Sequence, residues 1–143
     1  MATKPKKILC VCIGNSDRSP VMAAVLGMFL KNAGHEVVVE SAGTNAKEGS
    51  AAEFGVMAAK RLGLDISGHQ KTHVSNVRLA DYDLVVCMDD KIAGSIIEQG
   101  VDMKKVFNAQ ITNPWPCQFP DQYDVTMRQI LVASYDIIKF YFA

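Results

Sequence analysis

The sequence has no excess of charge of either sign, since its 15 lysine and arginine residues balance 15 aspartate and glutamate residues. A chain without net charge offers no broad electrostatic attraction to nucleic acid or to an anionic membrane. No apolar run approaches the roughly 18 residues that a membrane-spanning helix needs. The basic start of the chain leads into an apolar run too short for a secretory signal. From these absences we expect a cytoplasmic protein that binds neither nucleic acid nor membrane.

Cysteine is also scarce, and its spacing does not fit a structural zinc site. The four cysteines include no CxxC pair, and they stand at Cys10, Cys12, Cys87 and Cys117. Without such a pair the sequence predicts no metal site. Cys10 and Cys87 lie inside apolar runs, so we expect both to be packing residues of a protein in a reducing compartment.

What the sequence does contain is a strand-to-helix turn suited to binding an anion. The apolar run from residue 8 to residue 11 predicts a buried strand, and Ser19-Pro20 is typical of a helix start with Ser19 as the N-cap. Gly14 and Asn15 tolerate left-handed backbone, so the loop between strand and helix can turn its N–H groups inward. With the positive end of the helix dipole, such a loop forms a phosphate site.

Two side chains supply the chemistry of this loop. Arg18 has a planar guanidinium group that can bind two phosphate oxygens at once. Cys12 stands at the end of the strand, where the helix dipole, Arg18 and inward N–H groups favour the nucleophilic thiolate. The Ser19 hydroxyl can donate a hydrogen bond to that thiolate. The predicted phosphate-binding residues are Ile13, Gly14, Asn15, Ser16, Asp17, Arg18 and Ser19.

At this loop the chain resembles the low-molecular-weight protein tyrosine phosphatases, a family that also includes thioredoxin-coupled arsenate reductases. The family signature, Val-Cys-x-Gly-Asn-x-x-Arg-Ser-Pro, stands here at residues 11–20. The resemblance continues at residues 41–44, 63–69, 83–89 and 113–114, so it covers nearly the whole chain. It implies hydrolysis of phosphotyrosine or another aryl phosphate monoester through a cysteinyl-phosphate intermediate, without a metal or organic cofactor.

The resemblance also implies supporting roles for several residues. Ser41 would brace the Asn15 side chain, and His69 would hold the phosphate loop by hydrogen bonding. Trp115 would offer a stacking face to an aromatic ring, although a half-buried packing role is an equal alternative. Lys47 stands in the loop that would form one wall of the site, where many relatives have an aromatic residue.

Two departures from the family pattern affect residues that would take part in catalysis. Relatives usually have a second cysteine in place of Asp17, and an aspartic acid in place of Asn113 that protonates the leaving oxygen. An amide has no proton that titrates in the useful range, so Asn113 predicts slow turnover. Asp121 and Asp17 are the alternative proton donors, with Asp121 preferred. Capping of the final helix would explain Asp121 without catalysis.

The order of elements predicts an α/β fold in one domain, residues 1–143. A helix over 20–32 between strands at 8–11 and 37–39 forms a βαβ unit, which requires a right-handed crossover and parallel strands. The same signals predict helices over 51–62, 91–99 and 122–142, and strands over 84–88 and 104–107. We expect three layers, with a four-stranded parallel sheet in the order 2-1-3-4 and helices on both faces.

We therefore predict a phosphoric monoester hydrolase that acts on a phosphorylated protein or a small aryl phosphate and releases inorganic phosphate. Two alternatives stay open. An arsenate reductase would need a downstream cysteine to resolve Cys12 as a disulfide, and Cys87 lies in an apolar strand without a cysteine partner. A phosphate-binding or phosphotyrosine-binding module with decayed catalysis would fit the amide at Asn113.

Overall fold

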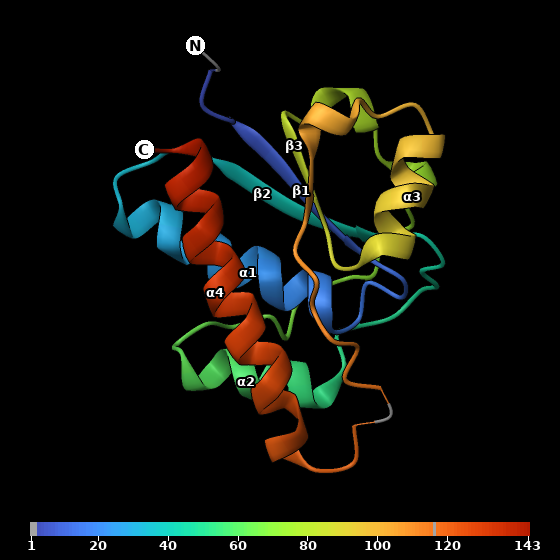
Figure 1. The fold of residues 1–143 in the computed structure, drawn as a ribbon. Coiled ribbons are helices and arrows are strands. Elements are labelled where there is room, and N and C mark those ends of the chain that lie inside the picture. Colours follow the sequence, from blue (N-terminus) through green and yellow to red (C-terminus); the bar gives the residue numbers. More distant parts are fainter. Residues whose placement is uncertain (1–2, 116) are drawn as a thin grey trace.

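The computed structural model describes residues 3–115 and 117–143, and its centre is a four-stranded parallel sheet (Figure 1). The strands run in the order β2-β1-β3-β4, which confirms the predicted order. Their bounds are β1 Lys7–Cys12, β2 Val38–Gly43, β3 Leu84–Cys87 and β4 Val106–Asn108. The register pairs Cys12 with Gly43, so β1 and β2 end side by side at one edge of the sheet.

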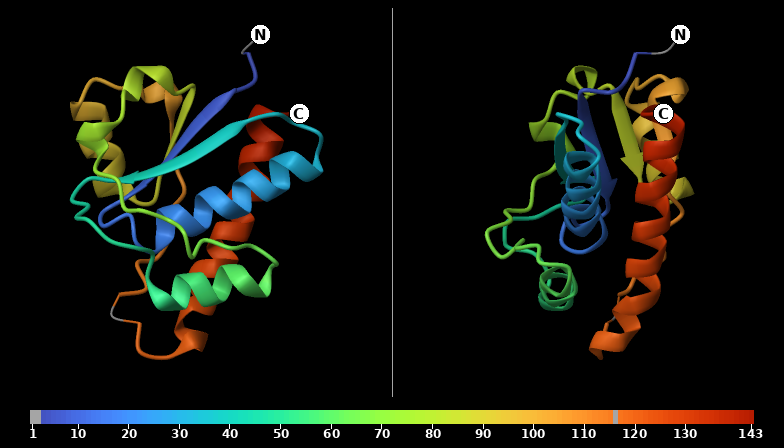
Figure 2. Two further views of the ribbon diagram at one scale, coloured as in Figure 1. Left: turned by 180° about the vertical axis from the view of Figure 1, so that it is seen from behind. Right: turned by 90° about the vertical axis from the view of Figure 1, so that its left-hand side faces the viewer.

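The structure describes four helices, α1 Arg18–Asn32, α2 Glu53–Arg61, α3 Asp90–Glu98 and α4 Tyr123–Tyr141, and all but α2 cover the two faces of the sheet. In Figure 1, α1 and α4 lie to the left of the sheet and α3 to its right, and the views of Figure 2 agree. α1 packs on β1, β2 and α4, α3 packs on β3 and β4, and α2 contacts α1 and α4. Short 3₁₀ turns occupy Val74–Asn76, Leu79–Asp81, Met103–Lys105 and Pro120–Gln122.

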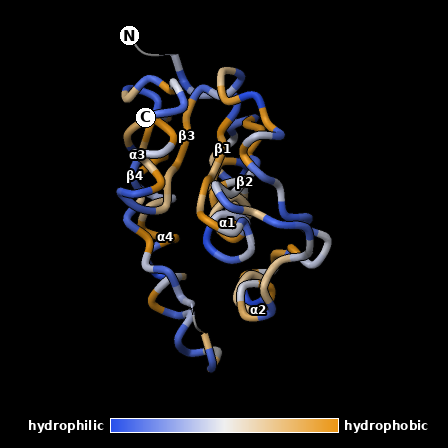
Figure 3. The backbone as a smooth tube through the Cα atoms, turned by 90° about the vertical axis from the view of Figure 1, so that its right-hand side faces the viewer, coloured by the Kyte–Doolittle hydropathy of each residue, from blue (hydrophilic) through white to orange (hydrophobic). Residues whose placement is uncertain are grey.

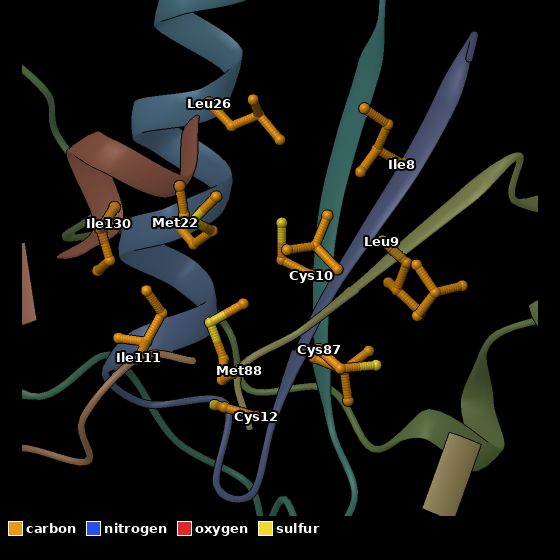
Figure 4. Close-up of a cluster of buried hydrophobic side chains, with 14 of the residues drawn as sticks. Ile8, Leu9, Cys10, Cys12, Met22, Leu26, Cys87, Met88, Ile111 and Ile130 are labelled. Carbon is orange, nitrogen blue, oxygen red and sulfur yellow. The ribbon is translucent and has the colours of Figure 1, made fainter. Parts of the chain in front are cut away.

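The core lies along β1 and β3, where Figure 3 shows the most hydrophobic part of the backbone. Alternation along β1 sends Cys10 toward Met22 of α1 and Ile130 of α4, while Leu9 and Cys87 point to the other face (Figure 4). All five side chains are fully buried. Burial raises the pKa of Cys87 to about 12, so Cys87 is a packed thiol as predicted.

The apolar residues of α4 do not all lie on its buried face. Ile130 and Ile137 are fully buried, but Val125 and Val132 are 52% and 61% exposed. The buried face runs at helical spacing through residues 123, 126, 130, 133, 134 and 137. The sequence offers apolar residues on two faces of this helix, and packing against α1 selects one of them. In α1 the buried side chains include Met22, Leu26 and Leu30.

The predicted helix cap at Asp121 is wrong. Asp121 lies within the 3₁₀ turn Pro120–Gln122, and α4 begins at Tyr123 with Gln122 at the N-cap position and no side-chain cap. The Gln122 side-chain oxygen instead accepts hydrogen bonds from the N–H groups of Gln118 and Phe119, at 2.7 and 3.0 Å. Among the described residues, no helix combines the length and the apolar character needed to cross a membrane.

The buried face of α4 gives a test of this packing. We expect Ile130→Ala to lower the free energy of unfolding by about 2–5 kcal/mol, because it leaves a cavity in the core. Val132→Ala on the exposed face of the same helix should change it by no more than about 0.5 kcal/mol. Urea denaturation measures both values, and equal losses in the two variants would contradict the described orientation of α4.

Candidate active site

A pocket of about 230 Å³ opens where β1 turns into α1. Figure 4 shows Cys12 at the end of β1, where the chain enters this turn. The turn lies at the carboxyl edge of the parallel sheet, the usual place for a ligand in such folds. The pocket is lined by Cys12, Ile13, Gly14, Ser16, Asp17, Arg18, Asn113 and Trp115. It thus brings the predicted phosphate loop together with the predicted acid position, about 100 residues away in the sequence.

Cys12 is buried at the base of this pocket and has two hydrogen-bond partners. Its Sγ atom lies 2.9 Å from Ser19 Oγ and accepts a hydrogen bond from the Asn15 N–H at 3.2 Å. Both contacts stabilise a thiolate. The prediction that Ser19 caps the helix is wrong, since α1 already begins at Arg18. Ser19 therefore lies within the first turn of α1, and its hydroxyl group forms a hydrogen bond with Cys12 instead of capping the helix.

The Asn15 side chain connects the phosphate loop to two other segments. Its Nδ2 atom donates to Ser19 Oγ at 2.8 Å and to Ser41 Oγ at 2.9 Å, while its Oδ1 atom accepts from the Thr72 N–H at 2.8 Å. The His69 Nε2 atom lies 2.8 Å from the Asn15 carbonyl oxygen. The structure thus places Ser41 and His69 where the resemblance put them. The Thr72 contact was not foreseen, because it uses a backbone group of a distant loop.

Only one of the two residues expected to have left-handed backbone has it. Asn15 has a φ of 53°, whereas Gly14 does not have a positive φ. The glycine that the loop does require is Gly43, at the end of β2. A Cβ atom there would overlap the Ile13 carbonyl oxygen and would lie 2.8 Å from the Asn15 nitrogen. A glycine at a strand end next to a tight loop is the signal that indicates such a close approach.

Arg18 is 3% exposed and is anchored beneath the pocket. Its Nη1 atom donates to Asp89 Oδ2 at 3.0 Å and to the Ile111 carbonyl oxygen at 2.9 Å. Burial alone would raise the pKa of Asp89, but hydrogen bonds from the Ile92 N–H and from Arg18 outweigh it and lower that pKa. Asp89 therefore stays ionised and fixes the guanidinium group. Its Oδ1 atom accepts a hydrogen bond from the Ile92 N–H at 3.0 Å, so Asp89 also caps α3.

The Arg18 contact of Asp89 was missed by reasoning from the sequence alone. Asp89 follows β3 and so stands at the same sheet edge as the phosphate loop. A buried guanidinium needs an acidic partner, and an aspartate after the neighbouring strand is the signal that could have identified one.

The remaining predicted residues divide into two groups. Asn113 and Trp115 line the pocket, and Asn113 Oδ1 accepts a hydrogen bond from the Trp115 N–H at 3.1 Å. Trp115 is 78% exposed, so the half-buried packing role is wrong and its ring is free to contact a ligand. Lys47 and Asp121 are exposed and do not line the pocket. The part of the chain that the structure describes contains no group of three or more metal-ligating side chains.

Residues 7–114 match the family model described as low molecular weight phosphotyrosine protein phosphatase. The chain belongs to this family. Membership makes this phosphatase a phosphoric monoester hydrolase, and it confirms the resemblance that the sequence motifs indicated.

Individual relatives are similar to this phosphatase over most of its chain. The low molecular weight protein-tyrosine-phosphatase Wzb of Escherichia coli (strain K12) is 28% identical over 135 residues, which cover 92% of this phosphatase and 87% of Wzb. A solved structure of a YwlE mutant from Bacillus subtilis is 25% identical with a TM-score of 0.86, covering 94% of this chain and 97% of that one. The YwlE arginine phosphatase from Geobacillus stearothermophilus is 25% identical with a TM-score of 0.77, covering 94% and 92%.

The close approach of Gly43 to the phosphate loop gives a test of the geometry of the site. We expect Gly43→Ala to lower kcat/KM on nitrophenyl phosphate by about 10²-fold, because the added methyl group must displace the loop backbone. The matched control is Gly27→Ala in α1, where a Cβ atom would meet nothing within 4 Å. Steady-state kinetics compare the variants, and a Gly43→Ala enzyme with wild-type kcat/KM would show that the contact does not constrain the loop.

Proposed function

We propose that this phosphatase hydrolyses phosphotyrosine, or a similar aryl phosphate monoester, through a phosphate ester of the Cys12 sulfur. The observation that carries the proposal is the Cys12 thiol, held by Ser19 Oγ and the Asn15 N–H at the base of a pocket that Arg18 also lines. Cys12 attacks phosphorus in line, while Arg18 and the N–H groups of residues 13–19 bind the equatorial oxygens. Water then cleaves the intermediate and releases inorganic phosphate.

The rim of the pocket supports an aromatic substrate. Ile13 is 40% exposed and Trp115 is 78% exposed, and both line the pocket, so a flat ring can lie between apolar surfaces. The similar Geobacillus stearothermophilus protein is an arginine phosphatase, so this fold also serves hydrolysis of that kind. We therefore expect a phosphotyrosine peptide to have a higher kcat/KM than a phosphoarginine peptide of the same sequence.

The amide at Asn113 supports slow turnover of substrates with a basic leaving group. Asn113 lines the pocket, but an amide can only donate a hydrogen bond to the ester oxygen and cannot give it a proton. General acid catalysis typically contributes about 10²–10⁴-fold. Unless another carboxyl group of the pocket supplies the proton, turnover of such substrates is slow.

The cysteines argue against the arsenate reductase alternative. That chemistry needs an accessible thiol to resolve Cys12 as a disulfide, and Cys87 is fully buried with its pKa raised to about 12 by burial. Cys117 is partly exposed but does not line the pocket. We further propose that residues 1–143 act as one domain, in the cytoplasm, on a phosphorylated protein or a small aryl phosphate, with no cofactor and no nucleic-acid or membrane partner.

The covalent mechanism makes a direct prediction for Cys12→Ser. Turnover of a phosphotyrosine peptide should fall below detection, since a serine hydroxyl is a far weaker nucleophile at neutral pH. Calorimetry should still show inorganic phosphate binding, because Arg18 and the loop N–H groups remain.

Cys117→Ser is the matched control and should keep wild-type activity. Residual hydrolysis by purified Cys12→Ser would contradict the covalent intermediate. A wild-type protein that binds phosphate but fails to hydrolyse nitrophenyl phosphate would instead support the phosphate-binding module. Arsenate reduction by the wild type that is lost in Cys117→Ser would support the arsenate reductase.

A further inference from the structure

We propose that Asp17, within the phosphate loop, is the acid that protonates the leaving oxygen in this enzyme. The proposal rests on the proposed function of the same pocket and names the residue that replaces the missing acid at Asn113. Of the residues that line the pocket, Asp17 alone has a carboxyl group. Asp121, preferred from the sequence as the substitute acid, is exposed and lies outside the lining.

The Asp17 carboxyl group is half-buried and has no fixed partner among the described residues. Its Oδ1 atom lies 3.2 Å from the position that a Cβ atom on Gly55 would occupy, so the start of α2 leaves room for it. Its backbone oxygen accepts hydrogen bonds from the Val21 N–H and the Tyr123 hydroxyl, both at 3.3 Å, which fixes the residue against α4. Among residues 3–115 and 117–143, the structure records no ion pair and no hydrogen bond of the Asp17 side chain.

Burial of the Asp17 carboxyl group favours its protonated form. Burial raises the pKa of this carboxyl group, and the cations Arg18 and Lys71 lower it by less. The other titratable groups that face it are the Cys117 thiol and the buried Tyr123 phenol, which are neutral. A phosphate dianion that enters the pocket adds negative charge beside Asp17 and favours the protonated form further. The enzyme–substrate complex therefore holds a proton inside the loop that binds the phosphate.

The Asp17 carboxyl group gives up a proton in the first chemical step and recovers one in the second. The Cys12 thiolate attacks phosphorus, the bond from phosphorus to the leaving oxygen breaks, and the Asp17 carboxyl group gives that oxygen its proton, so a neutral alcohol leaves. The Asp17 carboxylate then takes a proton from the attacking water as the oxygen of that water bonds to phosphorus. The sulfur–phosphorus bond breaks, and its electron pair returns to Cys12. The products are hydrogen phosphate, a thiolate and a protonated Asp17, and no further reactant is needed.

The decisive experiment compares kcat and KM for a series of aryl phosphates with leaving groups from nitrophenol to tyrosine. We expect Asp17→Asn to lower kcat on phosphotyrosine by about 10²–10⁴-fold and kcat on nitrophenyl phosphate much less. Its KM and its inhibition constant for inorganic phosphate should not rise, because the substitution removes a negative charge from an anion site. A merely structural role would instead weaken phosphate binding and lower both kcat values alike.

Two further variants complete the test. Asp121→Asn is the matched control and should keep the wild-type leaving-group dependence. Asn113→Asp combined with Asp17→Asn should restore kcat on phosphotyrosine, since it returns a carboxyl group to the pocket. The decline of wild-type kcat at high pH, where Asp17 loses its proton, should disappear in Asp17→Asn.

Three results would overturn the proposal. They are unchanged leaving-group dependence in Asp17→Asn, the kcat loss appearing in Asp121→Asn, and no rescue by the added aspartate. Absence of any wild-type hydrolysis of nitrophenyl phosphate would instead contradict the proposed function itself.

Discussion

The structure of the site depends on the hydrogen bonds of one buried amide, the side chain of Asn15. Its two polar atoms join three segments that are distant in the sequence, through Ser19 on α1, Ser41 on β2 and the backbone of Thr72. Leaving any of these buried groups without a partner costs about 1–3 kcal/mol. The same residue has the left-handed φ that turns the loop and points its N–H at the Cys12 sulfur. One residue, through its side chain and its backbone, thus fixes both the shape of the loop and the surroundings of the nucleophile.

The parallel sheet makes this convergence possible. The carboxyl ends of neighbouring parallel strands meet at one edge, so β1 contributes Cys12, β2 leads from Ser41 to Gly43, and β3 leads to Asp89. Asp89 holds Arg18 through an ion pair at 3.0 Å, and Gly43 lets the end of β2 lie against the phosphate loop. Residues outside the signature therefore carry much of its geometry. The fold acts as a rigid support for a short loop of reactive groups.

Reasoning from the sequence succeeded where the signal was local. The strand, turn and helix around Cys12 and the order of the sheet followed from apolar runs, a Ser-Pro pair and the handedness of βαβ units. It failed where the answer depended on a tertiary partner. Packing against α1 decides which apolar face of α4 is buried. The Ser19 hydroxyl forms a hydrogen bond with Cys12 and does not cap the helix. The contact between Arg18 at the start of α1 and Asp89 after β3 can be inferred only once β1 and β3 are placed side by side.

The most direct test of the central role of Asn15 is the affinity of Asn15→Gly for inorganic phosphate, measured by calorimetry beside the wild-type protein. Glycine keeps the freedom to adopt a positive φ, so this variant removes the amide hydrogen bonds without straining the backbone. We expect the affinity to fall at least about tenfold, equivalent to roughly 1.4 kcal/mol, because the loop loses its fixed shape. A variant that binds phosphate as tightly as the wild type would contradict this account.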